Sequence, residues 1–201
     1  MLSLLLATNN EDKIIELQIL FKDMNVQLVT PADIRLELDV VEDGRTYAEN
    51  ASKKAFAFAQ ASGLLSLADD SGLEVDALHG EPGLYSARYG STNGIKLSAP
   101  ERRKYLIGKL SLFPRPWKAR FKATIAIADM RSCFQIVEGV CEGEIISEER
   151  GTGGFGYDPI FLLSEMGRTM AELSLDEKNR LSHRAKAAVK AKDLLRRLAE
   201  T

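Results

Sequence analysis

The sequence predicts an α/β domain built on a mixed β-sheet. Short apolar runs typical of strands alternate along the chain with amphipathic stretches typical of helices. An early strand–helix–strand connection favours parallel pairing, whereas a short turn between two later strands favours an antiparallel hairpin. We find no internal repeat and no linker, and 201 residues is a natural length for one domain. We therefore expect a single domain over residues 1–201.

The first half of the chain supplies the strand–helix–strand pattern. Residues 2–7 are apolar on both faces, as in a central strand, and residues 11–24 repeat apolar side chains at helical spacing. Thr46 and Glu49 form a capping box, which opens a helix that ends at Gly63. The other elements expected in this half are short strands at 26–29 and 36–41, a buried strand at 64–68 and an extended segment at 73–78.

The second half supplies the hairpin. Residues 119–129 alternate in polarity and are followed across a short turn by a second strand at 133–146. Ser98 with Glu101 opens a helix that runs to about Leu112, and Ser174 with Glu177 forms a further capping box. The remaining elements are a stiff connection at 113–117, a glycine-rich loop at 151–156, a short strand at 159–163 and a final helix from about His183 to Leu198.

Composition excludes several classes of protein. With 27 basic and 29 acidic residues, the net charge of -2 excludes both a polycationic tail for nucleic acid and an acidic disordered chain. No apolar run is long enough to span a membrane, and residues 1–7 resemble a buried strand more than a signal peptide. Cys133 and Cys141 lack metal-site spacing, so we interpret them as reduced thiols. We expect a cytoplasmic protein that binds neither membrane nor nucleic acid.

The charge is unevenly distributed along the chain. Residues 176–201 carry eight basic and four acidic side chains, a net of +4, whereas the rest carries a net of -6. The acidic part contains candidate metal ligands, and the basic part contains candidate ligands for an anion. Lys190, Lys192, Arg196 and Arg197 lie late in the final helix, where they complement its dipole.

Polar clusters follow the predicted strands, which is where α/β proteins bind ligands. Residues 8–13 join a strand to a helix N-terminus, a site suited to phosphate, although an ordinary capped turn explains the same residues. Residues 42–54 place Glu42 before a turn, with Asn50 and Lys54 on one helix face. A solvated turn and a charged helix face are the alternative for this second cluster.

Three further clusters complete the set. Adjacent Asp69 and Asp70 repel each other unless a cation compensates, so a Mg²⁺ site is one interpretation and a turn ending in glycine is the other. The glycine-rich segment 151–159 lets the backbone approach a ligand, and Phe155 and Tyr157 could stack on a base. Residues 178–184 gather three cations and a histidine before the last helix, where an anion would offset the helix dipole. Together the clusters suggest a Mg²⁺-dependent nucleotide enzyme that activates water.

At these residues the sequence resembles the inosine triphosphate pyrophosphatase family, in particular its bacterial members. The likeness extends over nearly the whole chain, and several short motifs occur in one order. Asn9 is a departure, because relatives often have glycine there. The matching segments are Thr8-x-Asn10-x-x-Lys13, Glu42-x-Gly44, Glu49-Asn-Ala-x-x-Lys54, Ala68-Asp-Asp-Ser-Gly-Leu73, Pro82-Gly-Leu-Tyr-Ser-Ala-Arg88, the glycine-rich segment 151–159, Glu177-Lys-Asn and Ser182-His-Arg184.

The resemblance implies an elongated mixed sheet with two lobes and an active-site cleft between them, together with Mg²⁺ and a homodimer. It implies hydrolysis of ITP, dITP and XTP to the nucleoside monophosphate and pyrophosphate. Asp70 would be the general base and a metal ligand, with Glu42 as the second ligand and Asp69 nearby. The implied substrate-binding residues are Thr8, Asn9, Asn10, Glu11, Asp12, Lys13, Lys54, Ser71, Phe155, Gly156, Tyr157, Asp158, Lys178, His183 and Arg184.

Two other functions remain open at this point. A related pyrophosphatase for modified pyrimidine or 7-methylated nucleotides, as in Maf-type proteins, would share the fold. A nucleotide-sensing or RNA-binding module without catalysis is a different class, but aromatic residues are only 7% of the chain, and most lie in apolar patterns rather than on an exposed platform.

Overall fold

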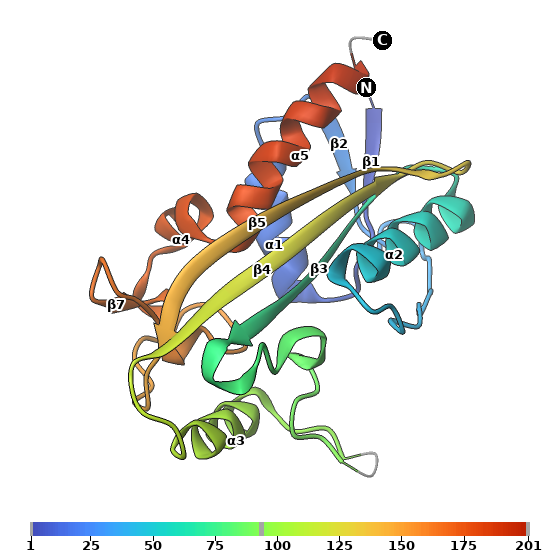
Figure 1. Cartoon of the computed structure of the whole chain (residues 1–201). Coiled ribbons are helices and arrows are strands. Elements are labelled where there is room, and N and C mark those ends of the chain that lie inside the picture. The colour runs from blue at the N-terminus through green and yellow to red at the C-terminus, as the bar shows by residue number, and fades with distance from the viewer. Residues whose placement is uncertain (1, 93–94, 200–201) are drawn as a thin grey trace. The chain divides into compact units, whose positions relative to one another are not determined.

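A seven-stranded sheet with the order β2-β1-β3-β4-β5-β6-β7 organises the described chain (Figure 1). The structure is a computed structural model that describes residues 2–92 and 95–199, and only the backbone of residues 133–134 and 198–199. Strand β1 pairs in parallel with β2 and β3, whereas β6 pairs antiparallel with β5 and β7, so the prediction of a mixed sheet is confirmed. The strands are β1 (Leu2–Leu6), β2 (Val26–Val29), β3 (Leu65–Val75), β4 (Trp117–Ala128), β5 (Cys133–Ile145), β6 (Phe161–Leu163) and β7 (Arg168–Thr169).

Most of the α-helices begin at the capping residues that the sequence contains. Thr46, Ser98 and Ser174 are the N-caps of α2, α3 and α4, and the N-cap of α1 is Asn10. Helix α2 ends at Gly63, which has a φ of 74° and so adopts the left-handed conformation that glycine tolerates best. The helices are α1 (Glu11–Phe21), α2 (Tyr47–Ser62), α3 (Ala99–Leu110), α4 (Leu175–Leu181) and α5 (His183–Ala199).

The chain divides into two compact units. Unit 1 comprises residues 1–70, 123–139 and 183–201, and unit 2 comprises residues 71–122 and 140–182. Strands β3, β4 and β5 each contribute residues to both units. Each unit has its own core, and each is described below by itself.

In unit 1, helices cover both faces of the parallel strands. Because side chains alternate along a strand, Leu4 and Leu6 face a core that includes Leu17 of α1 and Ala188 of α5. Leu5 faces the other way, into a core that includes residues of α2. This arrangement directs neighbouring residues of one strand to different helices, and it determines the surroundings of the site.

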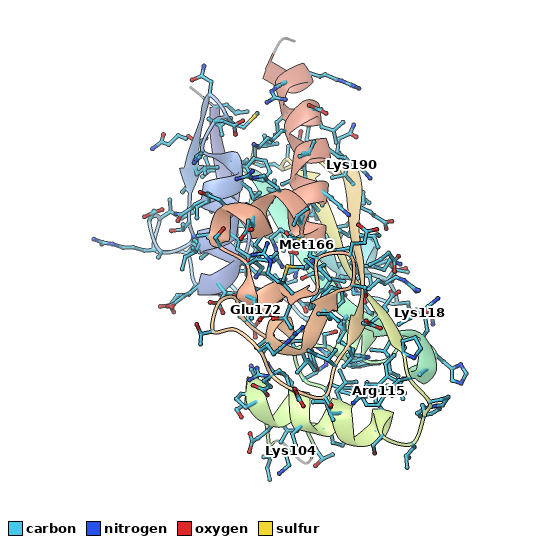
Figure 2. The ribbon with its side chains drawn as sticks, turned by 90° about the vertical axis from the view of Figure 1, so that its left-hand side faces the viewer. Lys104, Arg115, Lys118, Met166, Glu172 and Lys190 are labelled. Atoms are coloured by element: carbon cyan, nitrogen blue, oxygen red, sulfur yellow. The ribbon has the colours of Figure 1, made fainter. Side chains whose placement is uncertain are left out.

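Unit 2 has one core, built from the ends of β3–β5 together with α3 and the chain after β5. Leu106 and Leu110 of α3 pack there with Trp117, Phe121 and the ring of Tyr157. Short 3₁₀ helices connect the strands of this unit. Figure 2 labels Lys104 on α3. It also labels Lys190, a residue of α5 in unit 1, whose ammonium donates to the carbonyl of Glu138 at 2.7 Å.

Two of the expected elements differ in the structure. The predicted strand at 36–41 is wrong: this segment is a loop, and Leu36, Leu38 and Val40 pack against the α2 side of the core without a strand partner. The break predicted between 64–68 and 73–78 is also wrong: β3 runs without interruption from Leu65 to Val75, and residues 76–78, expected to be extended, form a 3₁₀ helix. Alternating polarity reports which side of a segment is buried and carries no information on strand pairing.

The hairpin, the final helix and one thiol agree with expectation. Strands β4 and β5 are neighbours in the sheet, and the turn that joins them is closed by a hydrogen bond from the Asp129 N–H to the Ser132 carbonyl at 3.0 Å. Cys141 is buried and is not part of a disulfide bond, whereas the side chains of Cys133 and Leu198 lie outside the described part of the chain. No helix in the described residues has the length and apolar character needed to cross a membrane.

Candidate active site

Two adjacent aspartates in β3 face opposite sides of unit 1. The exposed fraction is 0% for Asp69 and 7% for Asp70. Asp69 pairs with side chains of α1 and α5, whereas Asp70 pairs with side chains of α2. The strand that ends at this level is β1, because its register with β3 stops at the pair Leu6–Leu67. The sequence placed both carboxylates after a strand; the structure places them inside β3, beside the end of its neighbour.

Because β1 ends at this level, the main-chain carbonyl of Asp69 is available to two lysines. Its oxygen accepts hydrogen bonds from Lys13 Nζ at 3.2 Å and from Lys54 Nζ at 2.9 Å. Lys13 comes from the first turn of α1 and Lys54 from the second turn of α2. One backbone oxygen thus gathers two cations beside a helix N-terminus, an arrangement suited to a polyphosphate.

Asp70 lies among side chains of both charges. Lys54 Nζ is 3.6 Å from Asp70 Oδ1 and 2.6 Å from Glu42 Oε1, and Asn50 Nδ2 donates to Asp70 Oδ2 at 3.1 Å. Burial raises the pKa of the Asp70 carboxyl and the charge of Glu42 adds to this, although the ammonium groups of Lys54 and Lys13 act in the opposite direction. A carboxylate with a raised pKa is suited to accept a proton.

Asn50 connects the loop that carries Glu42 to Asp70. It is 2% exposed, and its Oδ1 accepts a hydrogen bond from the Gly44 N–H at 2.8 Å while its Nδ2 donates to Asp70. A Cβ on residue 44 would lie 2.5 Å from Asn50 Oδ1, so the close approach requires glycine. The sequence placed Asn50 on the same helix face as Lys54 but assigned it no role.

Asp69 belongs to a buried ion network. Arg184 Nε donates to Asp69 Oδ2 at 2.9 Å and Arg184 Nη1 donates to Glu16 Oε2 at 2.5 Å, and the arginine is 1% exposed. Burial by itself would raise the pKa of Asp69, but Arg184 and Lys13 hold that pKa well below its usual range. Arg184, which the resemblance assigns to the base, is therefore engaged by two carboxylates within unit 1. Glu16 was not anticipated; its only local signal is an acid one turn after Lys13 on an apolar helix face.

The segment before α1 presents polar groups around the helix N-terminus. Asn10 Oδ1 caps the helix by accepting from the Lys13 N–H at 3.0 Å, and Thr8 Oγ1 accepts from the Asn10 N–H at 3.2 Å. Asn9 Nδ2 donates to the Leu38 carbonyl at 3.0 Å. The other predicted residues in or beside this unit are the exposed Glu11 and Asp12, His183, which is buried at the first residue of α5, and Ser71, which is half-buried in β3 where unit 2 begins.

In unit 2, the glycine-rich loop wraps around a buried carboxylate. Asp158 Oδ2 accepts from Lys178 Nζ at 2.6 Å and from the Phe155 N–H at 2.8 Å, and both Asp158 and Lys178 are 3% exposed. A Cβ on Gly154 would lie 2.1 Å from the same carboxylate oxygen. The loop therefore folds as a defined structure around Asp158.

The two aromatic residues of this loop lie in different surroundings. Phe155 is half-buried, and Lys178 Nζ lies 4.9 Å from the centre of its ring. Tyr157 is 4% exposed and donates its hydroxyl to the Ser86 carbonyl at 3.0 Å. Phe155 has the exposure that a stacking residue needs, whereas the ring of Tyr157 belongs to the core of unit 2.

Glu42 and Asp70 fit a hard divalent cation. Their carboxylates both approach the ammonium group of Lys54, so the two acids lie close enough together to share one cation. In the described residues, no group of three or more His, Cys, Asp or Glu side chains is arranged to hold a metal ion. Mg²⁺ is commonly bound by one or two carboxylates together with substrate phosphates, so two ligands suffice for this chemistry.

Comparison with known proteins shows the family of this chain. The model of the Ham1 family matches residues 4–194. The chain belongs to the Ham1 family. Relatives of this Ham1-family chain include a protein from Desulforamulus reducens named dITP/XTP pyrophosphatase, which is 46% identical over 198 residues, 98% of this chain and 97% of that protein.

Solved structures give the same result for the fold. A HAM1 protein from Coxiella burnetii superposes with a TM-score of 0.88 at 38% identity, covering 98% of this chain and 100% of that one. The Staphylococcus aureus Ham1 protein gives a TM-score of 0.83 at 36% identity, covering 96% and 98%. The family resemblance and the α/β fold expected from the sequence are thus confirmed.

Proposed function

We propose that this Ham1-family chain hydrolyses the non-canonical purine nucleotides ITP, dITP and XTP to the monophosphate and pyrophosphate, and so removes them from the nucleotide pool. One observation carries the proposal. Asp70, a carboxyl with a raised pKa, lies next to a main-chain carbonyl, that of Asp69, which binds both Lys13 and Lys54. The names of the relatives supply the substrate class.

Asp70 serves as the general base in this proposal. It takes a proton from a water molecule whose oxygen forms a bond to the α-phosphorus, while the bond from that phosphorus to the bridging oxygen breaks and pyrophosphate leaves. Burial raises the pKa of Asp70, which strengthens it as a base. The hydrogen bond from Asn50 holds one carboxylate oxygen and leaves the other toward Lys54.

The phosphates bind beside the N-terminus of α1. Lys13 and Lys54 supply positive charge that balances the charge developing on the phosphate oxygens, and Thr8–Asp12 and Ser71 contribute polar contacts. Glu42 and Asp70 are the ligands we assign to Mg²⁺, and Asp69 is not, because Arg184 and Lys13 engage its carboxylate on the other face of β3. Bound there, Mg²⁺ would neutralise phosphate charge and polarise the reacting phosphorus.

The purine base is assigned to residues of the glycine-rich loop and Lys178 in unit 2, and to two residues of unit 1. Phe155 offers its ring face for stacking, with Gly156–Asp158 around it, and Lys178 supplies a donor beside that ring. His183 and Arg184 complete the predicted set. A donor directed at a 6-oxo group is left unpaired against the 6-amino group of adenine, which costs about 1–3 kcal/mol per buried donor. Selection against ATP follows from that penalty.

The proposal includes a homodimer and a cytoplasmic location. Both come from the family resemblance. Light scattering during size-exclusion chromatography tests the first, and fractionation of cells tests the second.

Product analysis tests the reaction. ITP is incubated with the full chain and Mg²⁺, and the products are separated by anion-exchange chromatography. IMP and pyrophosphate are the expected products. IDP and phosphate would refute cleavage between the α and β phosphates, and equal rates on dUTP, dTTP and ITP would refute the purine assignment.

A further inference from the structure

An arginine on the core side of α3 is bonded to the glycine-rich loop. Arg103 lies three residues before Leu106 and seven before Leu110, both fully buried, so it occupies the inward face of the helix. Arg103 itself is 8% exposed. A buried guanidinium is costly unless it is paired and hydrogen-bonded, so its partners account for its position.

Those partners are a carboxylate and one backbone carbonyl. Arg103 Nε and Nη2 donate to the two carboxylate oxygens of Glu149, each at 2.8 Å, and Nη1 donates to the carbonyl of Gly156 at 2.8 Å. The planar guanidinium makes two parallel hydrogen bonds to the carboxylate and still has another N–H that donates to the loop. The ion pair thus fixes the guanidinium, and the guanidinium fixes the loop at Gly156.

The bond to Gly156 completes a set of contacts on both sides of Phe155. On one side, the Phe155 N–H donates to Asp158; on the other, the carbonyl of the next residue accepts from Arg103. Gly156 has a φ of 62°, and no atom lies close to the position that a Cβ would occupy. Packing around residue 156 therefore does little to fix the backbone conformation there. The hydrogen bond from Arg103 to the Gly156 carbonyl therefore holds the backbone in place.

We propose that Arg103, held by Glu149, is a positioning residue that sets the orientation of Phe155 for stacking on the purine base. This inference rests on the proposed function, since it assigns the base to Phe155. The side chain of Arg103 donates to Glu149 and Gly156, and we assign neither of these partners to the phosphates. A change at Arg103 therefore affects binding of the base and leaves binding of the phosphates unchanged.

The expected effect follows from the strength of stacking. Complete loss of a base–aromatic stack weakens binding by roughly 5- to 150-fold. Without Arg103 the ring remains present but is less well oriented, so we expect Arg103→Ala to raise the KM for ITP on the order of tenfold, with a smaller change in kcat.

The experiment compares a nucleotide with a ligand that has phosphates only. For each full-length variant, KM and kcat are measured with ITP and Mg²⁺, and the inhibition constant is measured for inorganic tripolyphosphate. The matched control is Lys109→Ala, which removes another ion pair of α3, to Glu81 at 2.8 Å, whose partners lie outside the loop. Thermal unfolding verifies that each variant is folded.

The expected result is a rise in the KM for ITP in Arg103→Ala alone, with the tripolyphosphate constant unchanged in every variant. A parallel rise of both constants, or no rise in either, overturns the inference. If Arg103→Ala does not fold, Arg103→Lys carries the test, because lysine keeps the charge but cannot hold Glu149 and Gly156 with one planar group. Failure of the unmodified chain to release pyrophosphate from ITP would instead refute the proposed function.

Discussion

Replacing either of the two aspartates of β3 by asparagine should affect stability in one case and activity in the other. Asp69→Asn and Asp70→Asn are the same isosteric change at neighbouring positions, and each removes one carboxylate charge. Asp69 is 0% exposed and paired with Arg184, whereas Asp70 lies on the other face with Asn50 and Lys54. If each face has the role described above, the first variant loses stability and the second loses activity.

The cost at Asp69 follows from the buried ion network. Removing one partner of a buried ion pair costs about 3–5 kcal/mol, because the other charge remains buried. Glu16 still accepts from Arg184 Nη1, so we expect the lower end of this range, about 3 kcal/mol. For a chain of this size, that loss lowers the unfolding midpoint by roughly 6–12 °C. The lowered pKa of Asp69 leads to the same expectation, because it means that the charged carboxylate stabilises the folded chain.

Asp70→Asn has the opposite pattern. The pKa of Asp70 is raised chiefly by burial, so the folded chain disfavours its charge, and a neutral side chain of the same shape costs less than about 1 kcal/mol. Loss of a general base lowers kcat by about 10²- to 10⁴-fold.

Calorimetry without ligand and pyrophosphate release from ITP measure the two effects on the same preparations. The argument is refuted if Asp69→Asn unfolds at the temperature of the parent chain. It is equally refuted if Asp70→Asn keeps its activity, or if it loses as much stability as its neighbour.

Three further predictions test separate features. Lys54→Ala should raise the KM for ITP by at least about tenfold, as expected for loss of a charged hydrogen-bond donor, with an unchanged circular dichroism spectrum; an unchanged KM would exclude contact with phosphate. Gly139→Ala should destabilise the chain by about 3 kcal/mol in urea unfolding, because its Cβ would lie 2.1 Å from the His183 carbonyl oxygen, and a neutral effect would contradict that packing. Burial raises the pKa of Tyr89 to about 12, so its contribution to stability is complete below the ordinary value of 10.0 and is lost as the pH rises through the folded value. In a spectrophotometric pH titration, Tyr89→Phe should remove a phenolate absorbance step near pH 12 from that of the parent chain; the shift is contradicted if the step that the substitution removes lies near pH 10.

The sequence predicts those parts of the fold that local interactions determine. Thr46, Ser98 and Ser174 each satisfy free backbone donors at a helix start, so their helices begin where the capping pattern indicates. The continuity of β3 could not be predicted in this way. Four small or polar residues, Asp69–Gly72, suggest a turn. In the structure they lie in a strand that is flanked by β4, and cations from α1, α2 and α5 bind the two aspartates.

Some residues of the candidate site could also be predicted from the sequence, and others could not. Asp70, Glu42 and Lys54 lie in motifs that the sequence displays, and the structure brings them together in unit 1. The partners of Asp69 and Arg103 could not be predicted, because Arg184 is 115 residues from Asp69 and Glu149 is 46 residues from Arg103. No periodicity or cap links residues at such separations, and only the tertiary fold brings their charges together.

The alternation of a β-strand explains how neighbouring carboxyls acquire different properties. Side chains of residues 69 and 70 must face opposite ways, so each is surrounded by a different set of helices. Asp69, paired with Arg184, secures the strand and presents its carbonyl to both lysines, whereas Asp70 is kept at a raised pKa by burial. A base carried by a paired strand is held more rigidly than one on a loop. The anchoring of Asp69 therefore stabilises the strand that carries Asp70, while the acid–base property of Asp70 depends on its own face of β3.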